Sequence, residues 1–389
     1  MEKNRTMRTL RLALAVAIGF LVPPAVAEQT AAPKPAETVA VRAVPVAKGL
    51  VNPWSLAFLP DGRMLVTERP GRLRVVAANG TVSKPISGLP PIAARSQGGL
   101  LDVALDPAFP QNNLIYFTFS ETRPRDGSAT SVARARLVLA NGPEGGRLED
   151  LRIIFRQQPA ADGNLHYGGR IAIDRDGQLF VTLGDRNHLR DRAQTLDNHL
   201  GKVVRIGPDG TAPPDNPFVG KPGIAPEIWS YGHRNPQSAA LHPATGRLWT
   251  IEHGARGGDE INTPEAGRNY GWPVITYGRD YSGARIGIGT RNEGMEQPLY
   301  YWNPSIAPSG MAFYAGNRVP EWAGSLFVGS LVQTHLARLV LRDGQIVAEE
   351  RLLTELGERI RDVRQGPDGA IYVATDSPDG QILRIDPAR

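Results

Sequence analysis

The sequence contains no cysteine among its 389 residues. Without a thiol the protein forms no disulfide, and it has no cysteine nucleophile, thiolate metal site, haem thioether attachment or iron–sulfur cluster. A chain of this length buries a core large enough to be stable without cross-links.

Several well-known catalytic and binding motifs are also missing. The sequence has no Gly-x-Ser-x-Gly elbow, no His-Glu-x-x-His, no P-loop and no dinucleotide fingerprint. It has no basic stripe interleaved with aromatic residues, which argues against nucleic acid as a partner. The formal net charge is +5, but four basic residues and one acidic residue lie within the first 27 positions. Most of the positive excess therefore belongs to the N-terminal segment.

The N-terminal segment has the features of a targeting signal. Basic residues precede the apolar run Leu12–Val22, and the small residues Ala25–Ala27 follow it. This order predicts a secretory signal peptide over residues 1–27, with an uncleaved membrane anchor as the alternative. Residues 28–43 are rich in Ala and Pro and predict a mobile leader. We expect a periplasmic protein with no stable membrane span after cleavage, whose folded domain covers residues 44–389.

No long amphipathic helix pattern is present, and a different unit recurs. Each copy has apolar alternation, a tight turn and a second strand rich in Val, Leu, Ile, Phe or Tyr, as expected for a β-hairpin. The copies are Trp54–Glu68, Leu101–Phe119, Ile171–Asp185, Ser238–Glu252, Ser309–Gly329 and Arg361–Thr375. Six copies predict an all-β protein, a six-bladed β-propeller, with seven blades as the alternative. Loops at one end of such a fold converge on one pocket.

The stretch "GNLHYGGR" places His166 before two glycines. A neutral imidazole accepts a proton from a hydroxyl near neutral pH, and Asp185 at the end of the same hairpin is suited to holding the ring. The two glycines leave room for a ligand, and Arg170 is suited to an anion. A histidine capping a loop, with glycines forming a tight turn, explains the same string equally well.

Three further strings carry candidate ligand-binding residues. "GHRNPQ" sets the guanidinium of Arg234 beside the amide of Asn235, a pair suited to a carboxylate-bearing ligand or to an exposed loop. "EHGARGGDEIN" holds three carboxylates among glycines, which favours a hard cation such as Ca²⁺ without matching an EF-hand. "ERIRDV" places Arg359 and Arg361 on one face of a strand. Two neighbouring cations favour an anion or acid between them.

These strings occur in order with others, namely "NPWSLAFLPDGRMLVTERPGRL", "QGGLLDVALDPAF", "HYGGRIAI", "DNPF", "GHRNPQ", "GGDEIN", "GRNYGWP", "APSG" and "RIRDV". Together they resemble the soluble aldose sugar dehydrogenases that use pyrroloquinoline quinone (PQQ), within the glucose/sorbosone dehydrogenase family. The resemblance extends from Val44 to the C-terminus and implies a six-bladed β-propeller. It implies oxidation of the anomeric hydroxyl of aldose sugars to lactones, with hydride transfer to PQQ and onward transfer to an unidentified electron acceptor.

The resemblance also implies roles for individual residues. His166 matches the catalytic base and Asp185 the acid that holds it, while Arg359, with Arg361, faces the quinone and stabilises the developing oxyanion. The matching cofactor contacts are Gln97, Arg234, Asn235, Tyr281, Arg359 and Arg361. A calcium ion on PQQ matches the backbone carbonyls of Gly254 and Ala255, and a second, structural calcium matches Glu260 and Tyr270.

The sequence departs from this pattern at two positions. Val332 stands where many relatives carry a lysine that reaches the cofactor, so that contact is missing or is replaced by Gln333. Leu165 stands where the soluble glucose enzyme has an aspartate, which favours the broad-range aldose branch. The alternatives are a calcium-dependent propeller lactonase or other hydrolase, and a non-catalytic sugar-binding propeller. The oligomeric state, monomer or homodimer, stays open.

Overall fold

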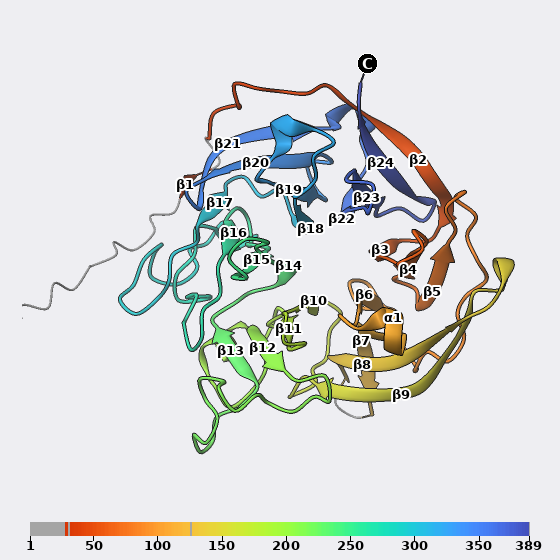
Figure 1. The fold of residues 1–389 in the computed structure, drawn as a ribbon. Helices are drawn as coiled ribbons and strands as arrows, with labels where there is room; N and C mark the ends of the chain where they lie inside the picture. The colour runs from red at the N-terminus through yellow and green to blue at the C-terminus, as the bar shows by residue number, and fades with distance from the viewer. Residues whose placement is uncertain (1–27, 30–31, 125–126, 389) are drawn as a thin grey trace, which may run out of the picture.

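The structure is a computed structural model that describes residues 28–29, 32–124 and 127–388. The predicted signal peptide lies outside the described residues, and so does its cleavage site. Within the part that is described, no helix is long and apolar enough to cross a membrane. The fold is the predicted all-β six-bladed propeller, with the blades arranged radially around a central channel (Figure 1).

The first three blades follow one another along the chain. Blade one has three strands, and blades two and three have four each. Their strands are β3 (Pro53–Phe58), β4 (Met64–Glu68) and β5 (Arg72–Val76); β6 (Leu100–Leu105), β7 (Leu114–Arg123), β8 (Gly127–Leu139) and β9 (Gly146–Arg156); and β10 (Gly168–Ile173), β11 (Leu179–Leu183), β12 (Lys202–Ile206) and β13 (Ile228–Tyr231).

Blades four to six complete the ring. Blade four carries a two-residue strand, β1, on its outer edge, and the N-terminal strand β2 joins blade six. The strands are β14 (Pro236–Leu241), β15 (Leu248–Glu252), β16 (Asp259–Asn262), β17 (Tyr300–Trp302) and β1 (Glu28–Gln29); β18 (Pro308–Phe313), β19 (Ser325–Ser330), β20 (Leu336–Arg342) and β21 (Gln345–Leu352); and β22 (Ile360–Gln365), β23 (Ile371–Thr375), β24 (Gly380–Pro387) and β2 (Val41–Leu50).

Among the residues that the structure describes, helical structure is confined to short connections. These are α1 (Phe109–Asn112) and the 3-10 helices η1 (Gly142–Glu144), η2 (Arg190–Gln194), η3 (Pro320–Trp322) and η4 (Thr354–Leu356).

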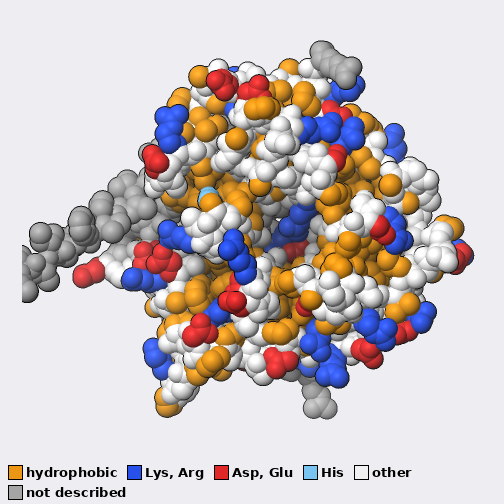
Figure 2. Space-filling model, in the orientation of Figure 1, with side chains coloured by type: hydrophobic (Ala, Val, Ile, Leu, Met, Phe, Trp, Pro, Cys, Tyr) orange, Lys and Arg blue, Asp and Glu red, His pale blue; other side chains and the backbone are white. Residues whose placement is uncertain are grey.

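The six sequence repeats are the two inner strands of the six blades. Their second strands, such as β4, β11 and β23, are buried along their whole length because neighbouring blades cover both faces. The hydrophobic core accordingly lies between adjacent blades. In Figure 2 the molecule is hollowed near its centre, and basic side chains lie inside a rim of hydrophobic ones.

The ring is closed by its two ends. Strand β2 pairs antiparallel with β24, so the first and last strands of the domain share blade six (Figure 1). The strand begins at Val41, three residues before the predicted boundary. The preceding segment contacts blade five, where the Glu349 amide donates to the Pro33 carbonyl and Arg338 donates to the Glu37 carbonyl.

Every innermost strand has a β-bulge near its start, at the same end of the channel. The register shifts between Pro53 and Ser55, Leu100 and Val103, Gly168 and Ile171, Pro236 and Ser238, Pro308 and Met311, and Ile360 and Asp362. A bulge leaves an extra residue unpaired and redirects its side chain. In three blades the single extra residue is Trp54, Gln237 or Arg361, and each of these lines the cavity described next.

Candidate active site

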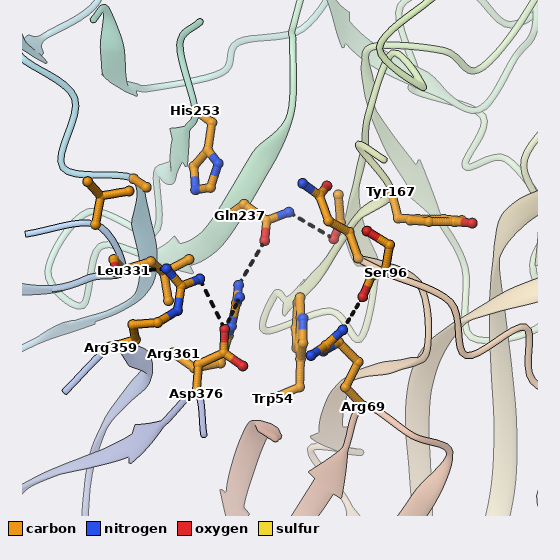
Figure 3. A pocket seen from close by; sticks show the side chains of 14 residues that line it. Trp54, Arg69, Ser96, Tyr167, Gln237, His253, Leu331, Arg359, Arg361 and Asp376 are labelled. Atoms are coloured by element: carbon orange, nitrogen blue, oxygen red, sulfur yellow. Dashed lines mark hydrogen bonds and ion pairs between the residues drawn. The ribbon is translucent and has the colours of Figure 1, made fainter. Parts of the chain in front are cut away.

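A cavity of about 390 Å³ lies at the bulged end of the channel, and all six blades contribute to it. Four of its lining residues are charged and one is a histidine, and Figure 3 shows their arrangement. The lining residues are Trp54, Arg69, Ser96, Gln97, Tyr167, Gly168, Gln237, His253, Ala307, Leu331, Val332, Arg359, Arg361 and Asp376.

Two of the predicted cofactor residues form a basic wall of this cavity. Nη2 of Arg361 lies 2.7 Å from the Asp376 carboxylate and Nη2 of Arg359 lies 3.3 Å from it, so two guanidinium groups share one acid. Burial opposes ionisation of Asp376, but the two arginines hold its pKa well below the usual range. The buried Nε of Arg361 has no hydrogen-bond acceptor among the described residues. This wall therefore has a net positive charge, and the Nε donor of Arg361 is available to an anion.

His166 is held on one side and free on the other. Its Nδ1 lies 2.7 Å from Oδ1 of Asp185, and its backbone amide donates to Oε1 of Gln97 at 2.8 Å. Asp185 also accepts from the indole Nε1 of Trp272 at 2.8 Å. With the Nδ1 proton donated to the carboxylate, Nε2 keeps its lone pair and has no protein partner among the described residues.

The surroundings of His166 favour the neutral ring. Burial lowers its pKa below the ordinary value, and the hydrogen bond with Asp185 only partly offsets that effect. Only 5% of the residue is exposed, and the cavity itself is lined by its neighbours Gln97 and Tyr167 rather than by His166. The sequence prediction that Asp185 lies beside His166 is confirmed.

The glycines after His166 serve the protein's own packing. A Cβ on Gly168 would lie 2.7 Å from the Thr182 carbonyl oxygen, and one on Gly169 would lie 2.6 Å from a methyl carbon of Leu101. Both have left-handed backbone angles, and so does His166 itself, with φ of 51°. Protein atoms occupy the position of a Cβ at both glycines, so packing and backbone conformation already require them. Gly168 also lines the cavity, and the expectation that the glycines make room for a ligand stays a prediction.

The left-handed loop is held by an arginine that the sequence analysis did not select. Arg186 is buried and donates to the carbonyls of Leu165 and Gly163, each at 2.7 Å. Its guanidinium lies over the Tyr167 ring, 3.6 Å from the centroid. The residue next to Asp185 thus clamps the segment that carries His166.

Arg170, considered as a partner for an anionic ligand, is used within the protein. It is fully buried, 2.9 Å from Asp362 and 3.4 Å from Asp102, and it lies over the Trp54 ring. It joins carboxylates of blades two and six beneath the cavity. Arg170 is a structural residue here, since its charge is already matched.

The Arg234–Asn235 pair lies beside the cavity and is buried. Asn235 Oδ1 accepts from the Gly168 amide at 3.1 Å, which supports the His166 loop. Nη1 of Arg234 donates to the backbone carbonyls of His253 and Gly254, and its buried Nε has no acceptor in the described part of the chain. The Gly254 carbonyl, predicted with that of Ala255 as a calcium ligand, therefore already faces a cation.

Glu260 and Tyr270 line a second, small cavity together with Glu252. Glu252 and Glu260 are cross-strand partners in β15 and β16, and Asn262 donates to both carboxylates. Burial, and then the charge of Glu252, raises the pKa of Glu260 well above its ordinary value. No cluster of three or more His, Cys, Asp or Glu side chains suited to a metal occurs within the described ranges. The repelling pair nevertheless presents the oxygen donors that a hard cation prefers.

Three other residues of the sequence analysis lie apart from the cavity centre. Tyr281 is 70% exposed in a surface turn and does not line the cavity. Val332 lines the cavity lip and is 63% exposed. The amide of Gln333 is engaged elsewhere, since it donates to the Ser305 carbonyl and accepts from Arg351. Gln333 is therefore directed to protein partners and not to a ligand.

Sequence analysis did not select Trp54, Arg69, Gln237, His253 or Asp376 as site residues, although all line the cavity. A signal for Asp376 was present in the repeats. Four of the hairpins have an acid as the last residue of the second strand or within two residues after it, and two of these acids were already under consideration. The four are Glu68, Asp185, Glu252 and Asp376.

Comparison with known proteins gives a consistent result. A family model described as "Glucose / Sorbosone dehydrogenase" matches residues 50–384. The chain is 45% identical to "Aldose sugar dehydrogenase YliI" of Escherichia coli over 87% of this chain and 91% of that protein. It is similar to the crystal structure of the apo-form of the soluble aldose sugar dehydrogenase from E. coli, with TM-score 0.86 and 44% identity over 90% of this chain and 100% of that one.

A more distant structure is named for its bound cofactor. The chain resembles the PQQ-bound form of the aldose sugar dehydrogenase from Streptomyces coelicolor, with TM-score 0.73 and 28% identity over 91% of this chain and 99% of that one.

Proposed function

Because the chain belongs to the glucose/sorbosone dehydrogenase family, we propose that it is a PQQ-dependent aldose sugar dehydrogenase that oxidises the anomeric hydroxyl of an aldose to the lactone. The observation that carries the proposal is the juxtaposition of a neutral, oriented imidazole with a cavity whose walls hold an excess of arginine. The names of the similar proteins in E. coli and S. coelicolor support the same chemistry.

The cavity residues suit PQQ, a flat ring system with three carboxylates. Arg359 and Arg361 share one acid and leave a buried donor without an acceptor, so they would hold carboxylates of the cofactor. Gln97 lines the same cavity, and we retain it, with Arg234 and Asn235, as cofactor-binding residues. The exposure of Tyr281 does not support that role for it. When bound, PQQ supplies a two-electron acceptor for the hydride of the sugar carbon.

His166 is the proposed general base. Asp185 holds the Nδ1 proton, so the free Nε2 lone pair is the atom that would take the proton of the sugar hydroxyl. Since burial lowers its pKa, the ring is neutral and ready to accept a proton at neutral pH. Arg359 and Arg361 are placed to stabilise negative charge that develops in the cavity.

Calcium fits one of the two predicted places better than the other. The repelling, desolvated pair Glu252 and Glu260 would be relieved by a divalent cation beside Tyr270. At Gly254 the guanidinium of Arg234 already contacts the carbonyl, so a cation there would have to displace or share that contact. Gly254 and Ala255 therefore remain the less favoured ligands.

Reconstitution with PQQ tests the proposal. Purified protein is titrated with PQQ in the presence and absence of Ca²⁺, and reduction of an artificial electron-acceptor dye is then followed over a panel of aldoses. We expect dye reduction that requires both PQQ and an aldose. Sugar-lactone hydrolysis without PQQ would instead indicate a hydrolase, and absence of PQQ binding would indicate a non-catalytic sugar-binding propeller.

The role of His166 has its own test. His166→Ala should lower turnover by about 10²- to 10⁴-fold, the usual contribution of a positioned base. Its affinity for PQQ should change little, because the arginine wall is untouched. Near wild-type turnover by the PQQ-loaded variant would remove His166 from the mechanism. We place the reaction in the periplasm on the basis of the basic and apolar N-terminal segment.

A further inference from the structure

Arg69 is the least engaged charged side chain of the cavity. It follows β4, and Figure 3 shows it on the other side of the Trp54 ring from Arg359 and Arg361. One guanidinium nitrogen, Nη1, donates to the Ser96 carbonyl. No carboxylate among the described residues lies within ion-pair distance of it, and its other N–H groups have no protein acceptor in that part of the chain. The remaining N–H donors of Arg69 are therefore available to a ligand in the cavity.

The backbone around Arg69 holds the side chain in place. Ser96 has a left-handed φ of 52°, unusual for a residue with a side chain, and it is the Ser96 carbonyl that contacts Arg69. Gly99 packs directly against Arg69, since a Cβ there would lie 2.0 Å from the Arg69 carbonyl oxygen and 2.6 Å from its Cγ. The Ser96 carbonyl therefore contacts the head of Arg69, and Gly99 packs against its stem.

The charges of the cavity lining do not balance. Three guanidinium groups, those of Arg69, Arg359 and Arg361, face it, and Asp376 is the single carboxylate of the lining. Asp376 is in contact with Arg359 and Arg361, so the positive charge of Arg69 is left without a direct partner. A ligand that matches this lining carries negative charge at two separate places.

We propose that Arg69 forms a second anion subsite, which binds one carboxylate of a flat polycarboxylate whose other carboxylates contact Arg359 and Arg361. The inference rests on the proposed function for the identity of that ligand, PQQ. It gives the cavity a cation on the far side of Trp54, while Val332 at the lip supplies none. The alternative is that Arg69 only orders the loop that contains Ser96.

Equilibrium binding of PQQ, followed by its absorbance and by quenching of tryptophan fluorescence, separates these roles. Arg69→Gln should weaken PQQ binding by about 10- to 100-fold, the effect of losing a charge-assisted contact. The salt dependence of the affinity should also become shallower, because one charge pair is lost. Arg69→Lys keeps the positive charge but loses the paired guanidinium donors. Its affinity for PQQ should lie between that of wild type and that of Arg69→Gln. Arg63→Gln, at a partly exposed arginine paired with Asp61, is the matched control and should bind like wild type.

A trimethyl ester of PQQ, which has no carboxylates, provides the second arm. Wild type and Arg69→Gln should bind it equally, because only the carboxylate contact is removed. Equal weakening for PQQ and the ester would show a structural role and overturn the inference. Equal affinity of wild type and Arg69→Gln for PQQ would overturn it too, with the proposed function intact. If wild type fails to bind PQQ at all, the proposed function falls and the inference falls with it.

Discussion

His166 and Asp185 form a coupled unit whose two residues set both the direction and the protonation of the ring. Asp185 accepts from His166 Nδ1 and from Trp272, so it fixes which ring nitrogen is free. The same carboxylate raises the pKa of His166 against the larger, lowering effect of burial. Orientation and basicity therefore depend on one side chain.

Asp185→Asn should change the pH dependence of the reaction in a defined direction. The rate falls on the acid side as the imidazole becomes protonated, and in wild type this fall lies below the ordinary histidine pKa of about 6.5. Removing the carboxylate lowers the pKa of His166 further, so the acid limb should move to lower pH. The plateau should fall by about 10²-fold, because the ring is no longer held in one tautomer.

The measurement is kcat/KM of the PQQ-loaded enzyme from pH 4 to about 9, the range that brackets an ordinary histidine. Asp176→Asn, an exposed turn residue of the same hairpin, is the control and should leave the profile unchanged. An acid limb that stays in place or moves to higher pH would contradict the assignment of that limb to His166.

The loop before β10 and the segment after β11 together determine where His166 lies. Arg186 donates to two carbonyls of the loop and covers Tyr167, while Asn235 accepts from Gly168 at the start of β10. The left-handed backbone of His166 is thus imposed by its neighbours rather than by its own preference. The clamp is a property of two elements and not of one residue.

Arg186→Met should loosen this clamp. Two partly buried hydrogen bonds from a charged donor are lost, which should lower the free energy of unfolding by about 1–3 kcal/mol. Turnover should fall by up to about 10²-fold through displacement of His166, with little change in PQQ affinity. Arg186→Lys keeps the charge but not the paired donors. Its turnover and its free energy of unfolding should lie between those of wild type and those of Arg186→Met. Turnover equal to that of Arg190→Met, an arginine of η2 that is partly exposed, would show that the clamp has no catalytic effect.

Strands β15 and β16 place two acids side by side, and a bound cation would relieve them. Ca²⁺ should raise the melting temperature of wild type by mass action, since the unfolded chain lacks the site. Glu260→Gln should raise the melting temperature without calcium, because it removes the repulsion from Glu252, and should abolish most of the calcium effect. Glu265→Gln, an exposed acid paired with Arg247, is the control. An unchanged calcium shift in Glu260→Gln would exclude Glu260 as a ligand.

The sequence predicted the strands and their hairpins well, but it predicted the contacts between blades less well. The six hairpins have clear alternation and tight turns, so their number predicted the blades and the channel. The pairing of Asp185 with His166 was accessible because both belong to one repeat. Arg170 was misjudged because its partners Asp102 and Asp362 come from distant blades, and no local pattern shows that its charge is already matched.

The bulges explain a second gap in the sequence reasoning. Trp54 and Gln237 reach the cavity because an extra residue interrupts the register of an inner strand, and a period-two pattern cannot show which residue that is. The cofactor-binding role of Tyr281 was predicted from the family resemblance alone. Tyr281 lies in an exposed surface turn without regular secondary structure.

The propeller as a whole depends on the pairing of β2 with β24. Two graded truncations of the chain that begins at Glu28 test this. Removal of residues 28–40 deletes the contacts of Pro33 and Glu37 with blade five and should lower the melting temperature by a few degrees. Removal of residues 28–50 also deletes β2, with its buried Ala47 and Leu50, and exposes the edge of β24.

The longer truncation should lower the melting temperature by about 10 °C or more and promote aggregation through the open edge. Circular dichroism during heating and light scattering measure the two effects. Equal melting temperatures for the two truncated proteins would mean that β2 adds nothing to the stability of the ring.

The pairing of β2 with β24 in blade six also determines the order in which the parts of the fold form. Synthesis proceeds from the N-terminus, so β2 is made before the inner strands of every blade, whereas its partner β24 is made after them. Blades one to five have all their inner strands before then, but the ring stays open until β24 has been made. Such a long-range pairing makes the final step of folding slow. A nascent chain that stops short of β24 therefore has no complete cavity at the channel end, and the arginine wall of blade six is the last part of the site to form.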